Sequence, residues 1–215
     1  FVSTCSNYGI TNDDALVNED YVLNPLSPYA KAKVKVENYL LRKKKVSYAS
    51  TILRFATAFG LSPRMRFDLT VNHFCYSMVK DKKIEVFDPE TWRPYCHVKD
   101  FSRLIFKVLD LDTKLVKNKI FNAGSDKNNF TKEGIVNLIK KRIPDANVLF
   151  KKDGVDKRDY RVSFSRVENE LGFNAKYNVD YGIDEILDML NKDNKFLKED
   201  ALKYRGNFDI LSVID

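Results

Sequence analysis

The sequence predicts a protein of the α/β class. Short apolar runs rich in β-branched or aromatic residues alternate along the chain with stretches whose apolar residues recur at helical spacing. The 215 residues are enough for one large domain or two small ones, and 44% hydrophobic with 31% charged residues is ordinary for a globular protein. No run of about 18 apolar residues is present, so we expect no membrane span.

The first part of the chain predicts a strand, a loop, a helix and a second strand. Residues 1–5 have the character of a buried strand, and residues 6–27 are rich in Asn, Asp, Ser and Pro, which is typical of a loop. Apolar side chains at helical spacing predict a helix over residues 28–45. The apolar run at residues 51–55 predicts a buried strand, followed by a loop that ends at Gly60.

The middle of the chain predicts a helix, a strand, a longer helix and a further strand. We expect a helix over residues 66–80 and a short strand over residues 83–88. The next segment starts extended and becomes helical near Val98. The apolar face of this helix is formed by Phe101, Leu104, Ile105 and Val108. Residues 119–125 predict a strand that turns at Gly124.

The last part predicts two further helices around a strand, and then a final helix. Thr131 is expected to cap a helix that runs to about Arg142. Residues 146–152 predict a strand, and the helix after it is expected to stop at Gly172. Residues 177–192 predict the final helix, and no element is assigned to the polar tail beyond it.

The charge pattern argues against nucleic acid as a partner. The net charge is +7, from 37 basic and 30 acidic residues. The lysines are scattered, however, and the dense run at residues 42–45 ends a predicted helix, where the helix dipole and water favour cations. We expect no nucleic-acid binding, and a small substrate that carries phosphate would use basic residues equally well.

The three cysteines indicate neither a zinc site nor a disulfide framework. Cys5, Cys75 and Cys96 are widely spaced and form no C-x-x-C. We therefore expect no bound metal and a reducing, cytoplasmic setting. The first residues are no signal peptide, and they have the pattern of a strand inside a domain. We expect that the N-terminal half of that domain lies outside these residues.

Tyr29 and Lys33 form a candidate catalytic pair. At positions i and i+4 of the predicted helix they share one face. A free tyrosine has a pKa of about 10, which is too high for a base at neutral pH, and a nearby cation favours the phenolate. Such a tyrosine can exchange a proton with a sugar hydroxyl or a ketone. The spacing is common by chance, and taken alone it favours a packed tyrosine and a solvated lysine.

Thr4 gives the pair a context. It ends the first predicted strand, and open α/β sheets bind ligands beyond the carboxyl ends of their strands. A hydroxyl at that place can hold a substrate oxygen in line with Tyr29. The alternative is a buried strand threonine that is bonded to the backbone.

Several stretches, in this order, resemble the extended short-chain dehydrogenase/reductases, and specifically their nucleotide-sugar epimerase/dehydratase group. The segment "FVSTCSNYG" looks like the family's strand that ends in Ser or Thr and closes on Tyr-Gly, and "SPYAKAK" looks like its Tyr-x-x-x-Lys helix. "LRFATAFG", "RPYCHVKD" and "FNAGS" are similar to three later family segments. "RDYRVSFSRVENELGF" resembles the late segment that ends in Leu-Gly-Phe/Trp.

The resemblance implies a fold and a division into domains. The fold is the C-terminal part of a Rossmann-type doubly wound parallel sheet with a small mixed α/β substrate domain. Residues 1–60 would form the second half of the dinucleotide-binding domain. Residues 61–215 would form mainly the nucleotide-sugar domain, with about 97–125 returning to the Rossmann sheet. The family's Gly-x-x-Gly-x-x-Gly loop is missing, because none of the eight glycines forms such a cluster.

The resemblance also implies the cofactor and the site residues. The cofactor is NAD, with NADP possible, and it would meet Tyr29, Lys33, Thr4 and the backbone near Ala56. Tyr29 would be the acid/base, Lys33 would tune it and bind ribose, and Thr4 would orient the hydroxyl. The substrate would meet the four residues that match the family's substrate side. These are Thr57, Asn72, Arg93 and Arg158.

The implied activity is NAD-dependent 4-epimerisation of a nucleotide-diphosphate sugar through a transient 4-keto sugar. The family's 4,6-dehydratases carry Asp-Glu after the catalytic Thr, whereas Cys5 and Ser6 stand here, so dehydration is disfavoured. An NADPH-dependent 4-keto nucleotide-sugar reductase and a catalytically idle binding or scaffold protein on the same fold remain alternatives. Family members commonly pair through two helices each, which implies a homodimer that uses the helix at residues 28–45.

Overall fold

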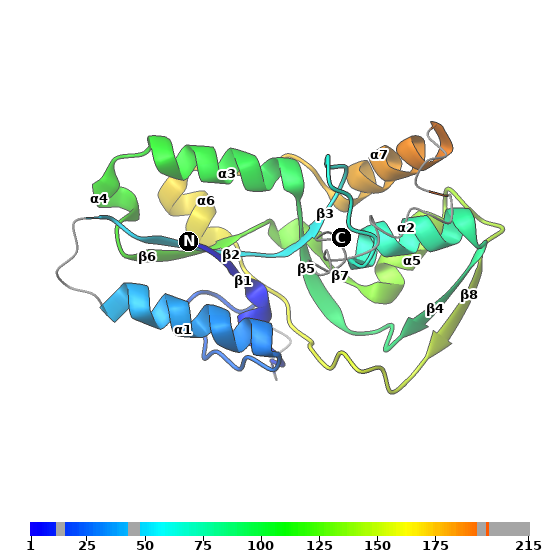
Figure 1. Cartoon of the computed structure of the whole chain (residues 1–215), viewed down its shortest axis with the longest axis horizontal. Coiled ribbons are helices and arrows are strands. Elements are labelled where there is room, and N and C mark those ends of the chain that lie inside the picture. Colours follow the sequence, from blue (N-terminus) through cyan, green and yellow to red (C-terminus); the bar gives the residue numbers. More distant parts are fainter. Residues whose placement is uncertain (12–15, 43–47, 193–196, 198–215) are drawn as a thin grey trace, which may run out of the picture.

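The computed structural model describes residues 1–11, 16–42, 48–192 and 197. Within this part of the chain, the elements form two groups, which lie at opposite ends of an elongated molecule (Figure 1). Strands alternate with helices through most of the order, so the predicted α/β class is confirmed. The described helices include none that is both long enough and apolar enough to cross a membrane.

The first group is built on a parallel sheet of three strands. Their order is β1 (Val2–Thr4), β2 (Thr51–Phe55) and β6 (Lys119–Ala123). Helix α1 (Pro28–Arg42) lies on one side of the sheet, and α3 (Val98–Asp110) and α6 (Ser165–Leu171) lie on the other (Figure 1). Helices on both faces are the expected solution for parallel strands, which must be covered on each side. The predicted doubly wound arrangement is therefore present.

The second group is a mixed assembly. One sheet has the order β3 (Thr57–Phe59), β5 (Trp92–His97) and β7 (Asn129–Thr131), and β4 (Lys83–Phe87) pairs in parallel with β8 (Asn147–Lys151). Helices α2 (Thr70–Lys80), α5 (Lys132–Lys140) and α7 (Val179–Lys192) pack against one another beside these strands. The short elements are η1 (Cys5–Tyr8), α4 (Thr113–Val116) and η2 (Asp126–Asn128).

Each group has its own apolar core. One core joins side chains of the β1–β2–β6 sheet to the inner faces of its helices, with Phe55 stacked on Phe101 at 3.8 Å between ring centroids. The second core lies between α2, α5 and α7. Residues 160–173 pack into the first core although they follow β8 in sequence, so the late part of the chain contributes to both groups. Domain boundaries near residues 60, 97 and 125 stay a prediction.

Most predicted elements are present, with local differences. The Thr131 side chain accepts a hydrogen bond from the Gly134 amide at 3.0 Å and caps α5, and Gly172 ends α6 with φ at 58°. Helix α2 begins at Thr70 and not at residue 66, because the Asn72 side chain binds the backbone of Gly60 and Arg66 and holds that segment as a loop.

Two short strands were not expected, and one prediction ends outside the described residues. The segment before Gly60 was predicted as a loop, but Thr57–Phe59 pairs with β5. The strand Asn129–Thr131 likewise forms only by pairing with β5. Helix α1 is described to Arg42, and the rest of its predicted length, like the tail after residue 192, lies outside the described residues apart from Leu197.

Candidate active site

Thr4 lies at the carboxyl edge of the parallel sheet. It is the last residue of β1 and is in register with Phe55 of β2, which is in register with Ala123 of β6. Its side chain is buried, and its oxygen accepts a hydrogen bond from the Ser6 amide at 3.1 Å, which caps η1. The hydroxyl of a threonine can donate while its oxygen accepts. Thr4 therefore lies at the edge where ligands bind such sheets, and its hydroxyl can donate a hydrogen bond there.

Tyr29 and Lys33 lie on one face of α1, as predicted from their spacing. Helix α1 begins at Pro28, and the Ser27 hydroxyl accepts a hydrogen bond from the Ala30 amide at 3.1 Å. The Tyr29 side chain is 56% exposed, and the Lys33 ammonium lies 5.6 Å from the centre of its ring. The structure thus brings a phenol and a cation together in an accessible position.

Lys33 also ties this face of the helix to β1. Its ammonium donates to the Val2 carbonyl at 2.8 Å and lies 4.9 Å from the centre of the Phe1 ring. Val2 precedes Thr4 by two residues in the same strand. Thr4, Tyr29 and Lys33 are therefore gathered at one strand and the helix beside it, and their catalytic roles stay predictions.

A buried carboxylate fixes α1 against the sheet. Glu37 follows Lys33 by one helical turn, and its side chain is 2% exposed. It accepts hydrogen bonds from Arg54 of β2 at 2.7 Å, from Asn7 of η1 at 2.8 Å and from the Ser3 hydroxyl. Burial opposes the charge of Arg54, but its hydrogen bonds to Glu37 raise the pKa of the guanidinium above the usual range. The orientation of the helix that carries Tyr29 is set by this contact.

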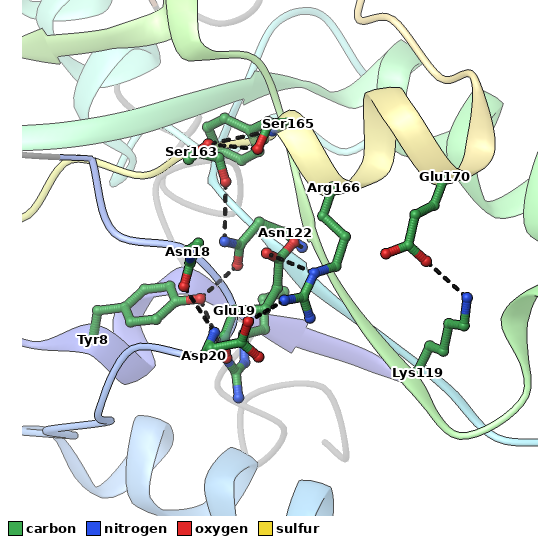
Figure 2. A network of polar contacts seen from close by, with 12 residues as sticks. Tyr8, Asn18, Glu19, Asp20, Lys119, Asn122, Ser163, Ser165, Arg166 and Glu170 are labelled. Atoms are coloured by element: carbon green, nitrogen blue, oxygen red, sulfur yellow. Dashed lines mark hydrogen bonds and ion pairs between the residues drawn. The ribbon is translucent and has the colours of Figure 1, made fainter.

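The same polar layer continues across the sheet to α6, as Figure 2 shows. The Tyr8 hydroxyl donates to the Asn122 side-chain oxygen at 2.8 Å and accepts from Arg54 at 3.1 Å. The Asn122 backbone N–H donates to the Glu19 carboxylate at 2.7 Å, and the Arg166 guanidinium lies 3.4 Å from that carboxylate. Burial raises the pKa of Glu19. This layer anchors the loop before α1 to the strands and to α6.

Two arginines from distant parts of the chain meet at one carboxylate. Arg93 lies in β5, and Arg158 follows β8. Asp156 is 3.2 Å from the Arg93 Nη2 atom and accepts two hydrogen bonds from Arg158, each of 2.7 Å. Arg158 also donates to the Ser6 hydroxyl at 2.8 Å, so the arginine pair lies close to the strand end that carries Thr4.

The remaining predicted residues make their contacts with other parts of the fold. The Ala56 amide donates to the Ala123 carbonyl at 3.0 Å, so this donor is already used within the sheet. Thr57 is half-buried and pairs with Tyr95 of β5. Asn72 uses its side-chain oxygen and nitrogen on the backbone of the Gly60 loop, which is a structural role. Substrate contacts of Thr57 and Asn72 stay predictions.

Cys5 and His97 are structural in this arrangement. The Cys5 thiol donates to the Arg54 carbonyl at 3.0 Å, and complete burial raises its pKa, so it stays a protonated thiol. His97 caps α3 by accepting from the Lys99 amide at 3.1 Å, and its other ring nitrogen lies 3.0 Å from the Glu185 carboxylate. Among the described residues, no group of three or more His, Cys, Asp or Glu side chains is placed to hold a metal ion.

Three residues of this region were missed in the sequence. Glu37 repeats the four-residue spacing of Tyr29 and Lys33 once more, and Arg54 is a charged residue inside the apolar strand of residues 51–55. Both were detectable signals of a buried polar contact. Asp156 gave no signal, because the pairing of its carboxylate with Arg93 depends on the tertiary fold.

A parallel sheet with helices on both faces is typical of the doubly wound α/β class. The family model of the NAD dependent epimerase/dehydratase family matches residues 1–124, which is more than half of the chain. The chain belongs to this family. The family contains NAD-dependent enzymes of the epimerase/dehydratase type.

The similar proteins are longer than this chain. An uncharacterised protein of Schizosaccharomyces pombe is 26% identical over 203 residues, which is 84% of this chain and 53% of that protein. The chain thus spans about half the length of this curated relative. The dTDP-glucose 4,6-dehydratase of Bacillus anthracis, solved with NAD, matches with a TM-score of 0.78 and 23% identity over 92% of this chain and 63% of its own.

Two epimerase structures match equally well. The UDP-glucuronic acid 4-epimerase of Bacillus cereus, solved with UDP-glucuronic acid and NAD, has a TM-score of 0.77 and 24% identity, covering 89% of this chain and 60% of its own. The UDP-glucose 4-epimerase of Thermotoga maritima, solved with UDP-glucose, has a TM-score of 0.78 and 24% identity, covering 89% and 62%. At these identities the likeness establishes the Rossmann-like fold.

Proposed function

We propose that the protein epimerises a nucleotide-diphosphate sugar at C4, with NAD as cofactor and a 4-keto sugar as the transient intermediate. The observation that carries the proposal is the placement of Tyr29 and Lys33 on one face of α1, with the Lys33 ammonium bonded to the strand that Thr4 ends. Membership of the epimerase/dehydratase family and the two similar 4-epimerase structures support this reading.

The residues present fit a nicotinamide cofactor in part. Lys33 offers an ammonium beside β1 and Tyr29 an exposed phenol on the same helix face, and both groups suit the hydroxyls of a ribose. Thr4 and the backbone near Ala56 lie at the carboxyl edge of the sheet. A bound nicotinamide would supply the acceptor and later the donor of a hydride at the sugar carbon. The glycine loop that would hold its pyrophosphate is not among the chain's glycines.

The proton at the sugar hydroxyl is moved by the side chains of this chain. Tyr29 removes the proton from the C4 hydroxyl while the C4–H bond breaks, and it returns a proton to the oxygen when that bond re-forms. Lys33, whose ammonium lies 5.6 Å from the centre of the Tyr29 ring, binds the ribose hydroxyls beside it. Thr4 donates to the same sugar oxygen and holds it toward Tyr29. The net reaction consumes no proton and no hydride, since both are returned.

Arg93 and Arg158 are proposed to hold the diphosphate. Guanidinium groups bind phosphate oxygens with paired hydrogen bonds, and these two already converge on one anionic side chain. Elimination of water, as in a 4,6-dehydratase, is disfavoured because Cys5 is a buried thiol of raised pKa and the Ser6 hydroxyl is bonded to Arg158. Neither residue can replace the missing carboxyl groups.

A product assay tests the proposal directly. The protein as its gene encodes it is incubated with NAD and UDP-, GDP-, dTDP- or CDP-sugars, and products are followed by NMR. We expect conversion of one of them to its C4 epimer without net change in nicotinamide absorbance at 340 nm. In a parallel reaction with NADPH and a 4-keto nucleotide sugar, net oxidation of NADPH without any C4 epimer in the first reaction would identify a reductase and refute the epimerase. No turnover and no bound nicotinamide in the purified protein would favour the idle scaffold.

The setting of the protein completes the proposal. We infer a cytoplasmic homodimer without nucleic-acid partners, in which α1 forms part of the contact between copies. This helix exposes Val36 and Tyr39, which are 39% and 55% exposed, on its solvent side. Sedimentation velocity tests the dimer, and a Val36→Glu change is expected to shift it to monomer.

A further inference from the structure

The carboxylate of Asp156 occupies the place between the two arginines. Arg158 binds it with both Nε and Nη2, each at 2.7 Å, and the Arg158 backbone amide donates to it at 3.2 Å. The Nη2 atom of Arg93 lies 3.2 Å from the same carboxylate. An anion is therefore already bound where the proposed function puts the diphosphate.

The side chains of the two arginines differ in burial. Arg93 is fixed, since its side chain is 4% exposed, its Nη1 atom donates to the Trp92 carbonyl at 2.7 Å, and its guanidinium lies 5.4 Å from the centre of the Tyr160 ring. Arg158 and Asp156 lie two residues apart on one segment and are both partly exposed, at 32% and 42%. A partly exposed carboxylate therefore lies against a buried cation.

Asp156 satisfies Arg93 incompletely. The Nη2 atom of Arg93 is buried and makes no hydrogen bond within the described part of the chain, although Asp156 lies 3.2 Å away. The contact is an attraction of charges without an aligned N–H donor. A phosphate group has more oxygens in more directions than a carboxylate, so it can satisfy this donor and those of Arg158 together.

We propose that Asp156 is an internal counter-ion that holds the diphosphate site of Arg93 and Arg158 in the free protein and leaves it when substrate phosphate arrives. The exchange sets the affinity for the nucleotide, because each binding event must first break the contacts of Asp156. Although burial opposes its charge, the two arginines hold the pKa of this carboxyl well below its usual range, so it competes as a full anion. This inference rests on the proposed diphosphate role of the arginines.

A titration with inorganic pyrophosphate and with UDP tests the exchange. Isothermal titration calorimetry compares the wild-type protein with Asp156→Asn and with the control Asp153→Asn, which removes the same charge from an exposed position nearby. Asp153 has φ at 63°, a conformation that asparagine also adopts readily. We expect pyrophosphate and UDP to bind Asp156→Asn about tenfold more tightly and Asp153→Asn within about twofold of wild type. Unchanged or weaker binding to Asp156→Asn overturns the exchange.

An Arg158→Gln variant separates this inference from the proposed function. If Arg158→Gln weakens pyrophosphate binding while Asp156→Asn leaves it unchanged, the arginine site stands and the counter-ion role is refuted. If Arg158→Gln has no effect on the affinity, the diphosphate role itself is refuted, and the counter-ion role with it.

A measurement on the wild-type protein avoids any effect of substitution on folding. The Nε–H resonance of Arg158 reports its bond to Asp156 in a ¹⁵N NMR spectrum. We expect this resonance to shift when pyrophosphate saturates the protein, because the acceptor changes from carboxylate to phosphate. A resonance that stays in place while calorimetry shows binding contradicts the exchange.

Discussion

The buried ion pair between Glu37 and Arg54 offers the sharpest test of how α1, the helix that carries Tyr29 and Lys33, is held. In Glu37→Gln, the amide can keep one acceptor oxygen but must turn an NH₂ group toward a donor. The carboxylate oxygens accept from Arg54 at 2.7 Å and from Asn7 at 2.8 Å, as well as from Ser3. In either orientation, the NH₂ group of the new amide faces a donor of Asn7 or of Arg54. The Arg54 charge also loses its counter-ion.

The expected cost follows from the burial of the pair. The side chains of Arg54 and Glu37 are 3% and 2% exposed, so water cannot replace the lost partner. Removal of one member of such a pair costs about 3–5 kcal/mol. For a chain of this length, that is a fall of roughly 6–20 °C in the midpoint of thermal unfolding. The exposed pair Lys119–Glu170, each 41% exposed, provides the control, because Glu170→Gln should cost at most about 1 kcal/mol.

Urea unfolding followed by circular dichroism measures both variants and the double variant Glu37→Met/Arg54→Met. We expect the double variant to be more stable than Glu37→Gln, since an apolar pair leaves no buried charge unpaired. A Glu37→Gln loss as small as that of Glu170→Gln would refute the reasoning. Glu37→Met and Arg54→Met are measured in the same way. A double variant whose loss equals the sum of these two losses would also refute the reasoning, because the two side chains would then act independently.

The other predictions concern Tyr29, two glycines and His97. Tyr29→Phe should lower turnover by about 10²-fold or more, while Tyr39→Phe, on the same helix, should leave it near wild type; equal rates would remove Tyr29 from the acid/base role. Gly60→Ala should destabilise the protein by about 2–4 kcal/mol in urea unfolding, because φ is 101° and a Cβ would lie 2.1 Å from His97 Nε2. Gly172→Ala meets nothing within 4 Å and should cost about 1–2 kcal/mol, so similar losses at both sites would contradict this account. Burial lowers the pKa of His97 below its usual value of 6.5. As the pH falls, the histidine of the unfolded chain therefore takes up its proton before that of the folded chain. The folded state loses stability from about pH 6.5 down to the lowered pKa. His97→Gln should flatten this loss between pH 7.5 and 5.5, and an unchanged slope would show that another group causes it.

Local patterns in the sequence predicted the long elements because each carries its own signal. The strand at residues 51–55 and the helix from Val98 have the apolar spacing that their positions in the fold require. Thr131 and Gly172 were identified as helix ends because a cap and a left-handed stop act within a few residues. The same locality explains why Tyr29 and Lys33 were placed correctly on one helix face.

The unpredicted features all depend on contacts between distant residues. Thr57–Phe59 is a strand only because β5 lies beside it, and three residues carry too little pattern to show this. Glu37 finds Arg54 across 17 positions and two elements. Asp156 meets Arg93 only after β8 and β5 have folded into the same region. The motifs of the site could therefore be recognised in the sequence, whereas the carboxylates that pair with its arginines could not.

The most direct test of the central claim follows the hydrogen at C4. A nucleotide sugar that the protein turns over is labelled with deuterium at C4, and the epimer is isolated and examined by mass spectrometry and ²H NMR. We predict that the epimer keeps the deuterium at C4, because the hydride that leaves the sugar is the one that returns. Loss of the deuterium to water would contradict hydride transfer at C4 and with it the role assigned to Thr4, Tyr29 and Lys33.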